Sequence, residues 1–190
     1  MLKIAILASG SGSNAQALIE HFGQSPWGRV EILVTNNPQA GVIQRAERLG
    51  VACKSFNPKT ESDEILFFLE SSADIILLAG YLRRIPVNWT RVFKGRMFNI
   101  HPSLLPKFGG KGMYGRYVHE AVSAAGESVT GITIHHVNEH YDEGAIIGQY
   151  QVEITPGEGP LSIEEKVRVL ELEYFGPTIE SWIAQLSEQQ

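Results

Sequence analysis

Hydrophobic residues follow two patterns in the first half of the chain. Short, continuous apolar runs predict buried strands at residues 4–8, 31–35, 52–56, 74–79 and 97–100. Between these runs, apolar residues recur at helical spacing and predict helices at residues 14–22, 43–49 and 61–69. This alternation is typical of a parallel sheet whose strands are connected by helical crossovers.

The pattern changes after the strand at residues 97–100. Residues 101–117 contain two prolines and four glycines and are expected to form a long loop. Two strands at residues 129–136 and 145–154 should then form a hairpin around the polar loop 137–144.

The C-terminal segment predicts a helix that a proline interrupts. Ser162 and Glu165 match a capping box, so the helix is expected to begin there. Pro177 should kink or break it before a final helix at residues 179–186. Together these elements predict a single domain over residues 1–190. Its class is α/β, an open and mostly parallel sheet flanked by helices, with an antiparallel addition toward the C-terminus.

Composition and charge narrow the class of protein without changing this fold. The chain has 190 residues, with 16 basic and 21 acidic residues and a net charge of −5. The acidic balance argues against a general nucleic-acid binder, and the single cysteine fits a reducing cytosol. The uncharged runs are too short for a membrane span, and the first residues lack a signal-peptide pattern. We therefore expect a cytoplasmic protein, monomeric or homodimeric, that binds small molecules rather than nucleic acid or a membrane.

A glycine-rich loop follows the first predicted strand and precedes the first predicted helix. Around Gly12 it allows a tight turn, and the backbone N–H groups at the helix start can bind an anion. A nicotinamide cofactor would require an acidic residue after the second strand, where the chain has Asn36 and Asn37. The loop therefore favours a phosphate monoester and no NAD. The alternative is a simple turn with Ser13 or Asn14 as helix N-cap.

Asn99 and His101 stand at the end of the fifth predicted strand, separated by one residue. Side chains two positions apart on an extended chain point the same way, so the amide and the imidazole are expected side by side. Such a pair can bind a developing oxyanion and supply a proton near neutral pH. The alternative is that both side chains satisfy backbone groups of the following loop.

Three histidines in the predicted hairpin invite a metal interpretation. His135 and His136 are adjacent on a strand and should face opposite sides of the sheet, and His140 lies in the loop. Zinc sites combine histidine with cysteine or carboxylates at characteristic spacings, and the sequence offers neither at a matching spacing. We expect no metal.

Five segments, taken in order, resemble one enzyme family. They are Leu7-Ala-Ser-Gly-Ser-Gly-Ser-Asn14, Leu78-Ala-Gly-Tyr-Leu-Arg83, Asn99-Ile-His-Pro-Ser-Leu-Leu-Pro-Lys107, Gly131-Ile-Thr-Ile-His135 and Tyr141-Asp-Glu-Gly144. The chain is similar to the formyltransferases that use 10-formyltetrahydrofolate, most closely to the glycinamide ribonucleotide transformylases of purine synthesis. The resemblance implies a Rossmann-like formyltransferase fold. It also implies transfer of a formyl group from 10-formyltetrahydrofolate, the cosubstrate, to the amine of phosphoribosylglycinamide.

The family's functional residues match positions of this sequence one by one. The resemblance gives catalytic roles, oxyanion binding and proton transfer without a covalent intermediate, to Asn99, His101 and Asp142. It gives contacts with the phosphate and ribonucleotide of the substrate to Gly12, Ser13, Asn14, Arg168 and Glu171. It gives the folate cleft to Leu82, Arg83, Ile85, Asn99, Val137 and Asp142. Without the resemblance we would expect Asp142 to be a turn residue. The alternative for Arg168 and Glu171 is a solvated surface ion pair.

The loop at residues 107–119 departs from the common form of the family. It is a few residues longer and lacks the usual Pro-Gly and double-histidine motifs, although His119 stands where one family histidine does. Its basic residues Lys107, Lys111 and Arg116 suggest attraction of the folate glutamate tail or of the phosphate.

Two other members of the superfamily remain as alternatives. One is a 10-formyltetrahydrofolate hydrolase, and the other is an amino-sugar N-formyltransferase. The Gly-Ser-Gly-Ser-Asn sequence of the glycine loop favours the transformylases over the hydrolase and the amino-sugar N-formyltransferase. The resemblance further suggests that the bond between Leu105 and Pro106 is cis.

Overall fold

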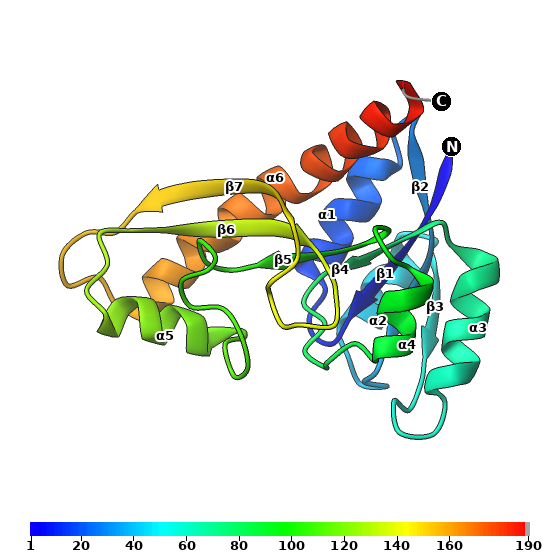
Figure 1. The fold of residues 1–190 in the computed structure, drawn as a ribbon, viewed down its shortest axis with the longest axis horizontal. Coiled ribbons are helices and arrows are strands. Elements are labelled where there is room, and N and C mark those ends of the chain that lie inside the picture. Colours follow the sequence, from blue (N-terminus) through cyan, green and yellow to red (C-terminus); the bar gives the residue numbers. More distant parts are fainter. Residues whose placement is uncertain (189–190) are drawn as a thin grey trace.

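The computed structural model describes residues 1–188 and contains one seven-stranded sheet, ordered β3-β2-β1-β4-β5-β6-β7 (Figure 1). The strands are β1 Leu2–Ala8, β2 Gly28–Thr35, β3 Ala52–Ser55, β4 Ile75–Leu78, β5 Met97–His101, β6 Val129–His136 and β7 Ile146–Glu153. Strands β1 to β5 pair in parallel, whereas β6 pairs antiparallel with β5 and β7. The predicted fold class, a mostly parallel sheet with an antiparallel C-terminal addition, is confirmed.

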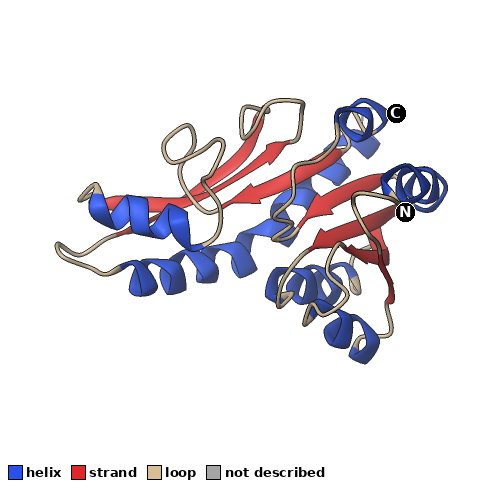
Figure 2. Cartoon of the chain, turned by 90° about the horizontal axis from the view of Figure 1, so that it is seen from below, coloured by secondary structure: helices blue, strands red, loops and turns tan. Residues whose placement is uncertain are grey.

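Helices cover both faces of this sheet (Figure 2). They are α1 Ser13–Phe22, α2 Val42–Arg48, α3 Ser62–Ser72, α4 Val87–Val92, α5 Arg116–Ala124 and α6 Pro160–Glu188. In β4, Leu77 packs in one core with α1, α2, α5 and α6, and the next residue, Leu78, packs in a second core with α3 and α4. Successive strand residues face opposite sides, so an uninterrupted apolar run is buried on both faces. None of the described helices is long and apolar enough to cross a membrane.

Two short helices lie in segments where the sequence pattern predicts none. Helix α5 begins at Arg116, inside the segment predicted as a loop. Its buried residues Val118, His119 and Val122 lie on one face at helical spacing, a signal that the loop prediction missed. Helix α4 has six residues, too few for a recognisable helical period.

The start of α6 differs from its prediction. The helix begins at Pro160, ahead of the expected capping box, because proline suits a first turn in which its missing N–H is not needed. Ser162 Oγ donates to Glu158 Oε1 at 2.6 Å instead of capping the helix. Hydrogen bonds from Lys166, Ser162 and the Thr155 N–H, the first of which has the largest effect, lower the pKa of the Glu158 carboxyl to about 2.

The predicted break at Pro177 is also wrong. Helix α6 continues through this proline to Glu188, so the expected separate helix at residues 179–186 is part of it. Phe175 and Ile179 on either side of the proline are buried in the same core. Burial on both sides holds the two halves in one helix, because tertiary packing overrides local propensity.

The sheet order determines where the candidate functional segments meet. Strands β1, β4 and β5 are parallel neighbours, so their carboxyl ends lie at one edge of the sheet. Open α/β sheets bind ligands in the crevice at this edge. The glycine loop follows β1, residues 79–86 follow β4, and the long loop follows β5.

Candidate active site

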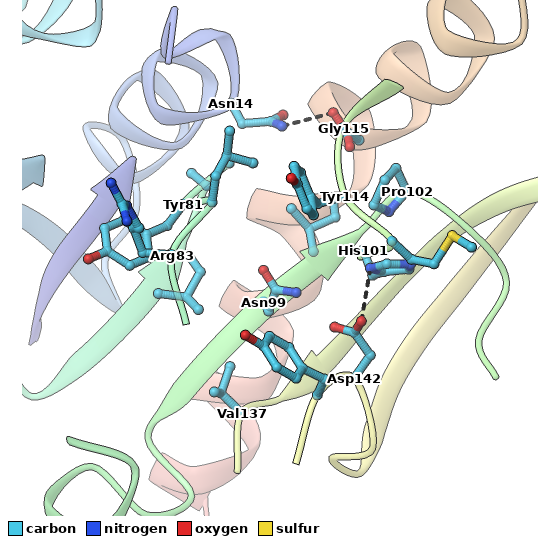
Figure 3. A pocket seen from close by; sticks show the side chains of 18 of the residues that line it. Asn14, Tyr81, Arg83, Asn99, His101, Pro102, Tyr114, Gly115, Val137 and Asp142 are labelled. Atoms are coloured by element: carbon cyan, nitrogen blue, oxygen red, sulfur yellow. Dashed lines mark hydrogen bonds and ion pairs between the residues drawn. The ribbon is translucent and has the colours of Figure 1, made fainter. Parts of the chain in front are cut away.

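A cavity of about 710 Å³ opens among these segments (Figure 3). The loop between β6 and β7 and one face of α6 complete its walls. All residues to which the family resemblance gives a catalytic, substrate or folate role line it: Gly12, Ser13, Asn14, Leu82, Arg83, Ile85, Asn99, His101, Val137, Asp142, Arg168 and Glu171. The fold therefore brings together residues from widely separated parts of the chain.

The glycine loop leaves the start of α1 accessible from this cavity. Gly12 has φ 82°, a left-handed conformation that glycine adopts without strain, and Val42 leaves no room for a Cβ atom there. Within residues 1–188, no side chain makes a capping hydrogen bond to the helix, so the alternative of Ser13 or Asn14 as N-cap is wrong. The N–H groups of the first turn remain available to an anion.

The residues that follow β2 brace this loop. Ser9 Oγ donates to Asn36 Oδ1 at 2.6 Å, and Asn37 Nδ2 donates to the Ser9 carbonyl at 3.4 Å. The Leu82 N–H donates to Ser9 Oγ at 3.0 Å and so ties the segment after β4 to the same loop. The asparagines thus support the loop at the position where a dinucleotide-binding fold has its ribose-binding acid.

His101 and Asp142 point toward one another in the cavity (Figure 3), with His101 Nδ1 3.6 Å from Asp142 Oδ2. The backbone of the long loop contacts both. His101 Nε2 lies 2.8 Å from the Phe108 carbonyl, and the Gly110 N–H donates to Asp142 Oδ2 at 2.8 Å. A carbonyl oxygen only accepts hydrogen bonds, so His101 Nε2 carries a proton. Nδ1 is therefore the nitrogen that can exchange a proton with Asp142 or with a ligand.

Beside Asn99 lies a histidine to which the sequence interpretation gave no role. Asn99 Nδ2 is 3.2 Å from His135 Nε2, and that nitrogen is 3.7 Å from Asp142 Oδ1. His135 is 2% exposed, and its burial lowers the pKa of the imidazole. The strand register could have identified it, because His135 is directly opposite Asn99 in the β5–β6 pair.

The adjacent His136 faces the other side of the sheet, as its position on a strand predicts. Its ring packs against Phe98 and Trp182, with centroid separations of 4.7 and 5.9 Å. Among the residues that the structure describes, no three His, Cys, Asp or Glu side chains gather in an arrangement that could hold a metal ion.

Glu171 connects α6 to the glycine loop. Asn14 Nδ2 donates to Glu171 Oε2 at 2.9 Å. Asn14 Oδ1 is buried without a hydrogen-bond partner in the described part of the chain. Burial raises the pKa of the Glu171 carboxyl, and the hydrogen bond from Asn14 opposes this effect. Arg168 lies one turn earlier on α6 and lines the same cavity.

The segment after β4 lies across the cavity from His101 and Asp142 (Figure 3). Ile85 is 8% exposed, whereas Leu82 is 54% exposed and offers apolar surface at the cavity wall. Val137 adds a half-buried apolar side chain, and Arg83 adds a positive charge. Apolar walls with a few polar groups are typical of sites for small organic ligands.

The long loop brings less free charge to the cavity than its sequence suggests. Lys107 Nζ lies 2.9 Å from Glu127 Oε1, and Arg116 Nε lies 3.6 Å from Glu120 Oε1. Neither basic residue lines the cavity, whereas Lys111 does.

Two features of this region, His119 and the Leu105–Pro106 peptide bond, were singled out by the sequence analysis. His119 on α5 lines the cavity and is 4% exposed, and burial lowers the pKa of its imidazole. Its Nδ1 has no hydrogen-bond partner among residues 1–188. The Leu105–Pro106 peptide bond is cis, as the family resemblance suggests.

The chain is similar to known proteins that are named phosphoribosylglycinamide formyltransferase. The chain is 44% identical over 160 residues to a chloroplastic phosphoribosylglycinamide formyltransferase of Vigna unguiculata, covering 80% of this chain and 51% of the relative. It is 35% identical over 187 residues to the phosphoribosylglycinamide formyltransferase of Bacillus subtilis, covering 94% and 93% of the two chains. The chain thus spans about half of the plant relative and nearly all of the bacterial one.

Solved structures and a family model agree with these sequences. The glycinamide ribonucleotide transformylase 1 of Geobacillus kaustophilus superposes with a TM-score of 0.88 at 37% identity, covering 96% of this chain and 99% of that one. The phosphoribosylglycinamide formyltransferase of Anaplasma phagocytophilum gives a TM-score of 0.89 at 26% identity, covering 97% and 87%. Residues 2–179 match the model of the formyl transferase family. The chain therefore belongs to the formyl transferase family.

Proposed function

We propose that this chain transfers the formyl group of 10-formyltetrahydrofolate to the amine of phosphoribosylglycinamide, in purine biosynthesis. The main support for this proposal is that two features line one cavity. They are the uncapped start of α1 and the cluster of Asn99, His101 and Asp142. The first can hold a phosphate, and the second can stabilise an oxyanion. The names of the Bacillus subtilis and Geobacillus kaustophilus relatives support the same activity.

The chemistry follows from the proton positions in the cluster. The substrate amine attacks the formyl carbon, and the carbonyl electrons move to oxygen. The Asn99 amide and the Nδ1–H of a charged His101 stabilise this oxyanion, while Nε2–H remains bonded to the Phe108 carbonyl. Asp142, 3.6 Å from Nδ1, stabilises the imidazolium and accepts a proton from the amine through water. Asp142 returns this proton through water to the folate nitrogen, so collapse of the intermediate breaks the bond between the formyl carbon and that nitrogen, tetrahydrofolate leaves as a neutral amine, and the formyl group stays on the acceptor amine.

The substrates would occupy opposite parts of the cavity. The phosphate binds the backbone of Gly12, Ser13 and Asn14, and the ribose reaches Glu171 and Arg168 on α6. The folate lies against the apolar wall formed by Leu82, Arg83, Ile85 and Val137, with Asn99 and Asp142 at its formyl end. No metal or nicotinamide takes part in this proposal. Residues 1–190 act as one formyltransferase domain on small molecules.

The test is an absorbance assay of purified protein with a 10-formyl folate. Deformylation that requires phosphoribosylglycinamide is the expected result. Equal release in water alone would identify a hydrolase, and release only with an amino-sugar nucleotide would identify a sugar N-formyltransferase. Either of these results would overturn the proposed acceptor.

A further inference from the structure

Asn99 can stabilise an oxyanion only if its N–H group, and not its carbonyl, faces the formyl oxygen. An asparagine amide presents either end after a 180° rotation, so the orientation must be imposed by neighbours. The neighbour in the structure is His135. The two residues are directly paired across β5 and β6, and Asn99 Nδ2 lies 3.2 Å from His135 Nε2.

The backbone determines which nitrogen of His135 carries its proton. His135 Nδ1 lies 2.8 Å from the carbonyl oxygen of His136, which only accepts hydrogen bonds. Nδ1 is therefore the protonated nitrogen, and in a neutral ring Nε2 has a lone pair. A lone pair accepts an N–H group and repels an amide oxygen, so it selects the orientation in which Asn99 Nδ2 faces His135.

The surroundings of His135 keep the ring neutral. Burial lowers its pKa most strongly, and the nearby His101 and His136 act in the same direction. The Asp142 carboxylate, 3.7 Å from Nε2, and the bond to the His136 carbonyl oppose this effect. His101 and His135 thus have different roles. His101 is proposed to be charged in the reaction, whereas His135 must stay uncharged to accept a hydrogen bond from Asn99.

We propose that His135 is a positioning residue: its neutral Nδ1–H form holds one N–H of the Asn99 amide and thereby directs the other toward the developing oxyanion. This inference rests on the proposed function, because it assigns His135 a role through Asn99. It adds a residue to the reaction machinery that touches no reacting atom.

Two variants test the role kinetically. In His135→Gln the terminal amide oxygen can accept from Asn99 at the same reach, whereas His135→Leu has no acceptor. We expect His135→Leu to lower kcat about 10-fold or more with both KM values within about threefold, because the donor is misdirected while binding is kept. His135→Gln should restore kcat to within about threefold of the parent. The matched control is His136→Gln on the opposite face, which should leave kcat unchanged.

A double variant separates this inference from the proposed function. If His135 acts through Asn99, Asn99→Ala combined with His135→Leu should be no slower than Asn99→Ala alone. Additive losses would overturn the positioning role. A near-normal Asn99→Ala enzyme would overturn the oxyanion role of Asn99, and with it the proposed mechanism.

The tautomer can be measured without any activity. Two-bond ¹H–¹⁵N spectra of histidine-labelled protein at pH 7.5, assigned with His135→Gln, should show Nδ1–H and a non-protonated Nε2. An Nε2–H tautomer or a doubly protonated ring would overturn the proposal. This result holds even if His135→Leu fails to fold.

Discussion

Glu171→Gln is the substitution for which the structure predicts opposite effects on stability and on binding. The carboxyl is partly buried between α6 and the glycine loop, and burial raises its pKa. A glutamine at this position can still accept the hydrogen bond that Asn14 donates. The variant therefore removes a charge from a desolvated position and keeps the main contact of the side chain.

The sign of the stability change follows from proton linkage. The pKa of Glu171 has its ordinary value in the unfolded chain and a raised value in the folded one. The folded state therefore loses stability as the pH rises from the ordinary pKa through the raised pKa. At neutral pH the glutamine variant should gain about 1 kcal/mol, within the range that single stabilising substitutions commonly give, which corresponds to about 2–4 °C in Tm. Below the ordinary pKa both side chains are neutral, and the gain should vanish.

Urea unfolding at pH 7.5 and pH 4 measures this difference, with Glu165→Gln on the exposed face of α6 as control. In the transfer assay the same variant should raise KM for phosphoribosylglycinamide about 10-fold, because a hydrogen bond to a charged group is lost. A variant that is less stable at pH 7.5 would refute the dominance of burial over the Asn14 contact. An unchanged KM would remove Glu171 from the ribonucleotide site.

The remaining predictions concern the oxyanion cluster and the glycine loop. Asn99→Ala and His101→Ala should each lower kcat about 10²–10³-fold in single-turnover assays, because each removes an oxyanion donor. Asp142→Asn should lower kcat to a similar extent, and near-normal turnover would exclude this carboxylate from proton transfer. Gly12→Ala should raise KM for phosphoribosylglycinamide much more than KM for the folate, because φ 82° and contact with Val42 disfavour any Cβ. Gly159→Ala, where a Cβ meets nothing within 4 Å, is the control for this substitution.

The sheet was predictable because its signal is local and strong. An unbroken run such as residues 75–78 can be buried on both faces only in the middle of a covered sheet. The positions of Asn99 and His101 followed from the same reasoning, since a strand end fixes where two alternate side chains point. The break expected at Pro177 failed for the opposite reason. Local propensity disfavours the proline, but burial of Phe175 and Ile179 holds the helix together.

Predicting the site required information that the sequence of a single segment does not contain. Asp142 has the sequence context of a turn residue, and indeed has φ 55°, yet its side chain lies 3.6 Å from His101. His135 acquires its position only through the register between β5 and β6. The pairing of Lys107 with Glu127 likewise joins residues twenty positions apart. These relations depend on how segments pack, so periodicity and composition do not reveal them.

The long loop differs in sequence from the common form of the family, yet this difference is compatible with the proposed chemistry for a specific reason. Its contacts with the reactive pair come from the backbone, since the Phe108 carbonyl meets His101 and the Gly110 N–H meets Asp142. Such contacts constrain φ and ψ rather than side-chain identity. Phe108 at φ 55° and Gly110 at φ 93° both adopt left-handed conformations, and at Gly109 a Cβ would collide with Leu105. The glycines therefore serve the backbone path that holds His101 and Asp142, while the loop's outer side chains can vary.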